Sequence, residues 1–226
     1  MLERGPSGAD SCQPWLDIDL TEYTLTRSRS SILHPCLQKL LPTLTTERVL
    51  DVGCGPGHLI SLLPTPPNLY VGFDLARPQL THARHAALNI HSEFIQADCR
   101  SLPLAERPIF DLIIASCLLN CLPNRRDLHH TCEALYRRLR PGGHLLAVVP
   151  HPEFDQYVLT GGAYSESGAA YTAIVNLGSG QLRFPNYHWT KRDLMSAMRT
   201  ERVALNTLEP TADGEPPPYL VIVGAQ

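Results

Sequence analysis

A glycine-rich turn between two apolar runs constrains the fold of this chain more than any other feature. The segment from Arg48 to Ile60 begins as an apolar run, breaks at Gly53, Gly55 and Gly57, and resumes as a second apolar pattern. This order predicts a buried strand, a tight turn and the start of a helix. Because glycine has no Cβ and the first N–H groups of a helix face the turn, a ligand can lie against the backbone there. We therefore predict a ligand site, although a turn that only reverses the chain is the alternative.

Two acidic residues flank this turn in the order that a nucleotide site requires. Asp51 stands two residues before the first glycine, and a strand-like run at 69–73 ends in Asp74, 17 residues after the last glycine. In doubly wound α/β folds, an acid at the end of the second strand accepts hydrogen bonds from a ribose diol. Capping of the helix that begins near Pro78 is the alternative role for Asp74. The cap position belongs to Ala76, so we favour the ribose role.

Further apolar runs predict a sheet of parallel strands. The run from Phe110 to Ser116 is almost wholly apolar, as expected for a strand buried on both faces of a parallel sheet. A helical pattern from Leu128 to Leu139 follows, and Pro141–Gly143 is predicted to end that helix. With the runs at 92–99 and 144–149, five β-α repeats indicate a doubly wound α/β fold. Ligands of such folds bind at the carboxyl ends of the strands.

The pattern of the sequence changes after the fifth predicted strand. Residues 151–189 contain many glycines and aromatic side chains and little helical periodicity, which is typical of an insertion packed over a pocket. Runs at 171–175 and 181–184 flank the segment 176–180 and predict a hairpin. We expect this insertion to form a lid over the substrate.

The final part of the chain predicts one helix and two strands. Thr190 stands at the cap position of the helix. Runs at 203–208 and 219–223 predict strands whose connection is too short to contain a crossover helix. The two strands are therefore predicted to pair antiparallel.

The amino-terminal part predicts a leader and two covering helices. Residues 1–19 are rich in Gly, Pro, Ser and Asp, and Trp15 is their only large anchor. Helices are predicted over 21–29 and 31–41. Tyr23 and Arg27 lie four residues apart on one helix face and could reach the cofactor or the substrate, although a solvated helix face is the alternative.

Composition limits the classes of partner. The 226 residues suit one domain, and a net charge of −3 provides no positive field for nucleic acid or an anionic membrane. No apolar run approaches the roughly 18 to 20 residues that span a bilayer, and no signal segment is present, so we expect a cytoplasmic protein with a small-molecule partner. The seven cysteines are odd in number and mostly lie in apolar runs, which predicts reduced thiols. The oligomeric state stays open.

These motifs together resemble the class I S-adenosylmethionine-dependent methyltransferases from about residue 45 to the end. His151-Pro152-x-Phe154 and Tyr187-His188 resemble the small-molecule branch of that family. The family's acid-x-Gly-x-Gly-x-Gly motif begins at Asp51, its ribose-binding acid falls on Asp74 and its adenine-contacting acid on Asp98. The resemblance implies S-adenosylmethionine as cofactor, with S-adenosylhomocysteine as product. The cofactor-binding residues expected are Asp51, Gly53, Gly55, Gly57, Asp74, Asp98, Cys99 and Ser116. One departure is Asn120, where the family often carries a histidine.

The resemblance also implies a domain plan. We expect one α/β domain over 1–226 with a Rossmann-like, doubly wound seven-stranded sheet, a terminal antiparallel hairpin and a lid insertion. Its expected parts are cap helices at 1–45, a cofactor-binding half at 46–150, the lid at 151–189 and a final helix and strands at 190–226.

The predicted reaction is methyl transfer to an oxygen or nitrogen of a small metabolite. His188 and His151 are candidate bases because imidazole titrates near neutral pH, although a packed structural histidine is the alternative for each. A carboxylate acceptor would need no base. The substrate contacts expected are Tyr23, Phe154, Tyr187 and Trp189, and no metal is expected.

Three other functions are alternatives to this reaction. A nucleic-acid methyltransferase would need a basic cleft, and 151–189 contains only Arg183. A metal-assisted transferase could use His151, Glu153 and His188, but these lack tight ligand spacing. A protein that binds the cofactor for a non-methylating step such as cyclisation, or serves as a binding partner only, would need the same glycine turn and stays an alternative.

Overall fold

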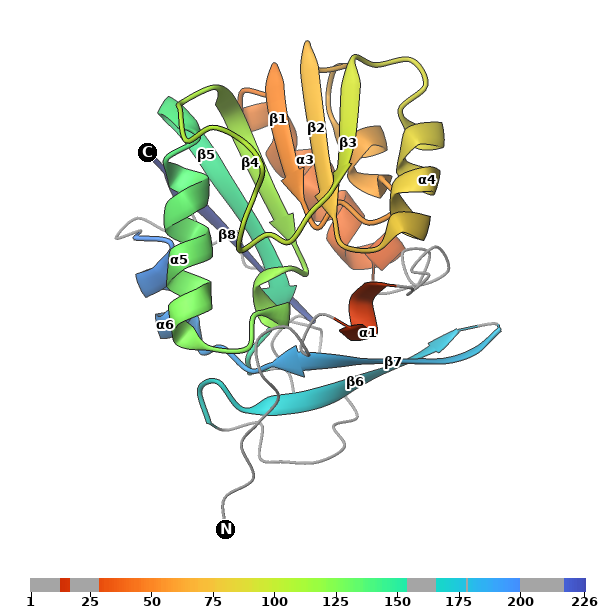
Figure 1. Cartoon of the computed structure of the whole chain (residues 1–226), viewed down its shortest axis with the longest axis vertical. Coiled ribbons are helices and arrows are strands. Elements are labelled where there is room, and N and C mark those ends of the chain that lie inside the picture. Colours follow the sequence, from red (N-terminus) through yellow and green to blue (C-terminus); the bar gives the residue numbers. More distant parts are fainter. Residues whose placement is uncertain (1–12, 17–28, 154–165, 178, 200–217) are drawn as a thin grey trace.

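The computed structural model describes residues 13–16, 29–153, 166–177, 179–199 and 218–226 (Figure 1). Its centre is a six-stranded sheet in the order β3-β2-β1-β4-β5-β8. Strands β1 to β5 are parallel, and β8 pairs antiparallel with β5 at the edge. The strands are β1 (Arg48–Val52), β2 (Leu69–Asp74), β3 (Ser92–Gln96), β4 (Phe110–Ser116), β5 (Leu139–Pro150) and β8 (Tyr219–Ala225).

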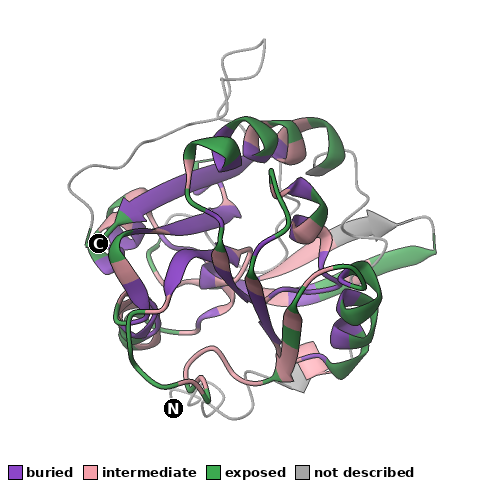
Figure 2. Cartoon of the chain, turned by 90° about the horizontal axis from the view of Figure 1, so that it is seen from above, coloured by how far each residue is buried: buried purple, intermediate pink, exposed green. Residues whose placement is uncertain are grey.

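Helices cover both faces of this sheet. They are α1 (Gln13–Leu16), the π-helix η2 (Arg29–Leu33), α3 (His34–Leu40), the 3₁₀ helices η3 (Leu41–Thr43), η4 (His58–Leu62) and η5 (Leu119–Cys121), α4 (Arg77–Ala86), α5 (Arg125–Tyr136) and α6 (Lys191–Ala197). Successive side chains of a strand point to opposite faces. In β1, Leu50 and Val52 therefore join the core under α5 and α6, whereas Val49 joins the core under α3. Figure 2 shows the buried strands between helices that expose their outer sides.

A separate two-stranded hairpin lies across the carboxyl ends of the parallel strands (Figure 1). It consists of β6 (Ala170–Leu177) and β7 (Gly180–Tyr187), which pair antiparallel. Strand β7 contacts α1, where the rings of Trp15 and Phe184 lie 5.2 Å apart between centroids. The hairpin therefore faces the edge of the sheet where α/β folds bind ligands.

Most predicted elements form where the sequence placed them. Strands β1 to β4, the hairpin and the helix after Thr190 are confirmed, and the final strand is antiparallel. The sheet has six strands in the described ranges instead of the seven expected. The strand expected at 203–208 lies outside the described residues, as do Tyr23, Phe154 and Cys12. The other six cysteines are free thiols.

Three details of the prediction are wrong. Pro141–Gly143 does not end a helix, because α5 stops at Tyr136 and β5 already begins at Leu139. A Cβ on Gly143 would lie 3.0 Å from the carbonyl oxygen of Asp111, so these residues let β5 pass close to β4 at an irregularity of the pairing. The helix predicted to follow the glycine turn is a short 3₁₀ helix, η4.

The third correction concerns the repeats. Residues 97–109 connect β3 to β4 without a helix, so the chain does not complete five β-α repeats.

None of the helices in the described part of the chain has the length and apolar character needed to cross a membrane.

Candidate active site

A cavity opens at the carboxyl ends of β1, β2 and β4. It encloses about 1160 Å³ when its open mouth is included. Six of the predicted cofactor residues line it: Gly53, Gly55, Asp74, Asp98, Cys99 and Ser116. The structure therefore brings four separate segments of the sequence to one space.

The glycine turn forms one wall with left-handed backbone. Gly53, Gly55 and Gly57 have φ angles of +74°, +52° and +83°. Residues other than glycine rarely adopt this backbone region. A Cβ on Gly55 would meet no protein atom within 4 Å, whereas one on Gly57 would lie 3.0 Å from the Cα of Ala83. Gly55 therefore leaves open space at the cavity, and Gly57 allows the turn to pack closely on α4.

Asp74 joins the glycine turn to the end of β2. Its Oδ2 accepts a hydrogen bond from the N–H of Gly55 at 2.8 Å, and its Oδ1 accepts one from the N–H of Ala76, also at 2.8 Å. Burial raises the pKa of this carboxyl, and the two N–H donors oppose that shift. Each carboxylate oxygen has a further lone pair, so the group can hold the turn and still accept protons from a ligand.

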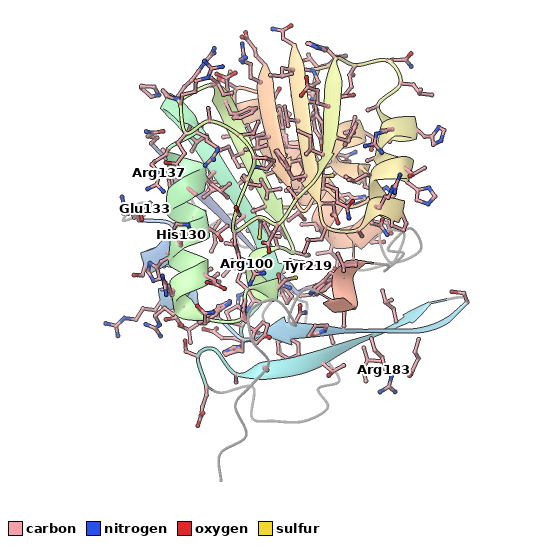
Figure 3. All side chains as sticks on the ribbon, viewed as in Figure 1. Arg100, His130, Glu133, Arg137, Arg183 and Tyr219 are labelled. Carbon is pink, nitrogen blue, oxygen red and sulfur yellow. The ribbon has the colours of Figure 1, made fainter. Side chains whose placement is uncertain are left out.

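Asp98 lies in an ion pair that the sequence did not reveal. Arg100 donates to it from Nε at 3.0 Å and from Nη2 at 2.6 Å, and its Nη1 lies 3.4 Å from Asp127 of α5. Arg100 also lines the cavity, at the carboxyl ends of the strands (Figure 3). The signal in the sequence for this ion pair was Arg100 itself, a basic residue two positions after Asp98.

The exit of β4 forms a mostly apolar wall. Cys117 has a φ angle of +55°, which is uncommon for a side chain larger than glycine and marks a constrained turn. Its carbonyl accepts from the thiol of Cys121, 3.3 Å away, and burial raises the pKa of the Cys121 thiol well above its usual value. This thiol therefore stays neutral and contributes an apolar surface to the cavity.

Other cavity residues were not predicted. Trp15, which the sequence suggested only as an anchor of the leader, lines the cavity. So do His34 at the start of α3 and His58 directly after the glycine turn. The position of His58 next to Gly57 was a usable signal, whereas nothing local distinguishes His34.

Asp51 and Gly57, two predicted cofactor residues, are not among the described residues that line the cavity. Asp51 is fully buried on β1 and accepts a hydrogen bond from the hydroxyl of Tyr70 at 2.5 Å. It shares the strand face of Val49, toward α3. The structure thus gives Asp51 a contact that joins β1 to β2.

A smaller hollow beside this cavity brings together two of the predicted substrate residues and one predicted base. Tyr187, His188 and Trp189 line it together with Asn120 of η5, and its volume is about 220 Å³ with its open part. Burial lowers the pKa of the His188 imidazole, which Asp193 partly offsets. The described lining of either space does not include His151, whose pKa burial also lowers.

Buried polar contacts hold the hairpin to the rest of the molecule. The side-chain N–H of Asn120 donates to Oδ1 of Asn186 at 2.9 Å, and Asn186 donates in turn to the hydroxyl of Tyr171 at 3.3 Å. Asn186 is 2% exposed. These hydrogen bonds therefore connect the hairpin to η5. Cys121, which follows Asn120 in η5, lines the cavity.

Sequence comparisons agree with this geometry. The family described as "Methyltransferase domain" matches residues 49–143. A malonyl-[acyl-carrier protein] O-methyltransferase of Enterobacter lignolyticus is 34% identical over 124 residues, which are 53% of this chain and 47% of that protein. A trans-aconitate 2-methyltransferase of an Azoarcus species is 38% identical over 112 residues, 49% of this chain and 42% of that protein. The chain spans about half the length of the curated relatives it matches.

Solved structures extend the likeness of the fold beyond the matched segment. An S-adenosylmethionine-dependent methyltransferase from Mesorhizobium loti superposes with a TM-score of 0.60 at 18% identity, over 85% of this chain and 96% of that one. The amino pentose methyltransferase CalS10 from Micromonospora echinaspora, solved with S-adenosylmethionine bound, gives a TM-score of 0.54 at 21% identity, over 84% and 88% of the two chains. The segment 49–143 is therefore similar to the methyltransferase domain family, and the chain has the α/β fold of S-adenosylmethionine-dependent methyltransferases.

Proposed function

We propose that this chain transfers a methyl group from S-adenosylmethionine to an oxygen or nitrogen of a small molecule. The observation that carries the proposal is the convergence of Gly53, Gly55, Asp74 and Asp98 on one cavity. S-Adenosylmethionine is the methyl donor typical of the methyltransferase family that the segment 49–143 resembles. Small-molecule acceptors are supported by relatives named for trans-aconitate and for ubiquinone biosynthesis.

The residues present fit such a cofactor. The open space at Gly55 admits a ligand against the backbone, and the partly buried carboxylate of Asp74 offers lone pairs to a ribose diol. Asp98, held by Arg100, is the acid that we assign to the adenine of the cofactor. When bound, the cofactor supplies an electrophilic methyl group on a positively charged sulfur. The apolar wall after β4 would favour a site with little water around the methyl group.

The segment 151–189 acts as the lid of this site in our proposal. Its described part, the hairpin, covers the carboxyl ends of the strands and contacts Trp15 through Phe184 (Figure 1). The bond between Asn120 and Asn186 joins the lid to η5. A lid held by a buried bond can position an acceptor, which accounts for much of the rate gain when two reactants must meet in line.

His188 is the proposed base for an acceptor that must lose a proton. The acceptor atom forms its bond to the methyl carbon as the carbon–sulfur bond breaks, and the acceptor's proton passes to the imidazole. The lowered pKa of His188 keeps this imidazole neutral, and therefore able to accept, at neutral pH. His151 is the second candidate, but the described lining of the hollow does not include it.

The His188→Gln variant tests this role. Turnover should fall by roughly 10²- to 10⁴-fold while the affinity for S-adenosylhomocysteine is kept. The wild-type rate should rise with pH through a value below about 6.5, because burial lowers the pKa of His188, and the variant should lack that rise. A variant that loses turnover but keeps the rise would make His188 a residue that only positions the substrate.

The proposed reaction itself is tested by incubation with S-adenosylmethionine and separate phenol, amine and carboxylic acid acceptors. Mass spectrometry should find an acceptor heavier by one methylene unit together with S-adenosylhomocysteine. The alternative is a chain of the same fold that binds the cofactor without methyl transfer. Tight cofactor binding with no methylated product from any acceptor class would favour that alternative.

A further inference from the structure

The smaller hollow contains two buried polar atoms without partners. Oδ1 of Asn120 and Nε1 of Trp189 have no hydrogen-bond partner among the described residues, and the two side chains are only 5% exposed. Both residues line the hollow. A buried polar atom that lacks a hydrogen bond is costly, so such atoms in a native protein call for a bound group or an ordered water.

The two atoms have complementary hydrogen-bonding capacity. The amide oxygen of Asn120 only accepts, and the indole N–H of Trp189 only donates. A group that satisfies both must therefore donate and accept at once. A hydroxyl does this with a single oxygen, whereas a carboxylate cannot donate.

The charges around the hollow disfavour an anion. Its described lining contains no arginine or lysine, and Asp193 acts electrostatically on His188 from beside it. A buried carboxylate without a cation would be left uncompensated. This distinguishes the hollow from the larger cavity, which has Arg100 in its wall.

The hollow adjoins the larger cavity along η5. Asn120 lines the hollow, and the next residue, Cys121, lines the cavity. A volume of about 220 Å³ lies below the roughly 300 Å³ at the lower end of usual ligand pockets, so the hollow suits one end of a molecule. A molecule with that end in the hollow can extend past η5 toward the cavity.

We propose that the hollow binds a neutral hydroxyl group of the acceptor substrate, with Asn120 Oδ1 as its acceptor and Trp189 Nε1 as its donor. This inference rests on the proposed function and narrows its substrate class to hydroxyl-bearing molecules. Asn120 is thereby a substrate-positioning residue, and the acceptor class differs from the carboxylic acid for which the trans-aconitate relative is named.

The first test uses the indole N–H signals of the two tryptophans in ¹⁵N-labelled protein saturated with S-adenosylhomocysteine. The signal of Trp189 is identified by its loss in Trp189→Phe. Phenol is the hydroxyl probe and benzoate the matched carboxylate. Phenol should shift the Trp189 signal with saturation, and benzoate at equal concentration should not. A hollow that holds only solvent would leave the signal unmoved by phenol, and that result would overturn the proposal.

Two variants check the assigned atoms. Trp189→Phe keeps a ring but removes the N–H, and Asn120→Ser withdraws the acceptor oxygen. Each should weaken phenol binding, measured by calorimetry, roughly 3- to 10-fold. The control is His130→Gln, because His130 is exposed on α5 (Figure 3) and should not change the affinity. Because Trp189 lies in the core, Asn120→Ser provides an independent reading if Trp189→Phe does not fold.

The outcomes separate this inference from the proposed function. Unchanged phenol affinity in the folded variants, or benzoate binding as strong as phenol binding, would overturn the hydroxyl subsite even where S-adenosylhomocysteine still binds. Wild-type protein that fails to bind S-adenosylhomocysteine would instead contradict the cofactor assignment of the larger cavity.

Discussion

Asp74 combines two tasks in one side chain. It accepts hydrogen bonds from Gly55 and Ala76 and also lines the cavity, so it shapes the glycine turn while facing the cavity. These hydrogen bonds within the turn are compatible with the proposed ribose role of Asp74.

Replacing Asp74 with Ala should weaken S-adenosylhomocysteine binding by about 1.5 to 3 kcal/mol, because charge-assisted hydrogen bonds to the ribose are lost. Asp74→Asn should retain part of the affinity. Calorimetric titration measures both, with Glu93→Ala as control because Glu93 is an exposed acid on β3. If Asp74→Ala bound as tightly as the wild type, the carboxylate would be structural only.

Gly55 and Gly142 offer a matched pair of residues. Both have positive φ angles, and an added Cβ would meet no protein atom within 4 Å at either position. Alanine at each should reduce the free energy of unfolding by about 1 to 2 kcal/mol through backbone strain. Only Gly55→Ala should also weaken S-adenosylhomocysteine binding, because its methyl group occupies cavity space. Equal affinity of the two variants in calorimetry would show that the ligand does not approach Gly55.

At the scale of elements, the start of α6 secures the end of the hairpin. Asp193 and Thr190 form a capping box, and Asp193 also accepts from Ser167 at 2.6 Å and pairs with Arg125 of α5 at 2.8 Å. One buried carboxylate thus joins α6, α5 and the segment that enters β6. Burial alone would raise its pKa, but these donors prevail and lower it.

Asp193→Ala should therefore reduce the free energy of unfolding by about 1 to 2 kcal/mol in denaturant titrations at neutral pH. Because the folded carboxyl has a lowered pKa, its contribution is complete above the unfolded value of about 4 and is lost as the pH falls through the folded value. The difference between variant and wild type should shrink over that acid range. A difference that persisted below it would point to lost packing instead of lost charge.

Glu133→Ala is the control for this prediction. Glu133 pairs with Arg137 and Arg199 on the outer side of α5, where the partners are well exposed (Figure 3). Exposed ion pairs contribute about 0 to 1 kcal/mol. Glu133→Ala should therefore reduce the free energy of unfolding less than Asp193→Ala does. That reduction should not show a comparable dependence on pH in the acid range.

At the scale of the whole molecule, the glycine turn and the strand ends surround one cavity, where we propose that the cofactor binds. S-Adenosylhomocysteine at a hundredfold excess over Kd should add about 2.7 kcal/mol to the free energy of unfolding. For a chain of this size, that corresponds to a rise in Tm of roughly 5 to 11 °C. NAD at equal concentration should cause no rise. A melting curve that responds to NAD and not to S-adenosylhomocysteine would contradict the proposed cofactor.

The sequence by itself determined the elements whose signals are local. The glycine turn, the apolar runs of β1 to β4 and the cap of α6 depend on neighbouring residues, through backbone freedom, burial and capping. The acids at the strand ends followed from the same patterns, because carboxyl ends of parallel strands meet at one edge. Pro141–Gly143 misled the prediction because its local signal for a helix end was overridden by close pairing of β5 with β4.

Only the tertiary structure decided which distant side chains meet. Asn120 and Asn186 are 66 residues apart, and their contact depends on how the hairpin docks on η5. The strand face of Asp51, the pairing of Arg100 with Asp127 and the hollow beside Trp189 likewise depend on how several elements pack together. Such contacts carry no local signal, because the free energy that selects them arises from burial shared between segments far apart in the chain.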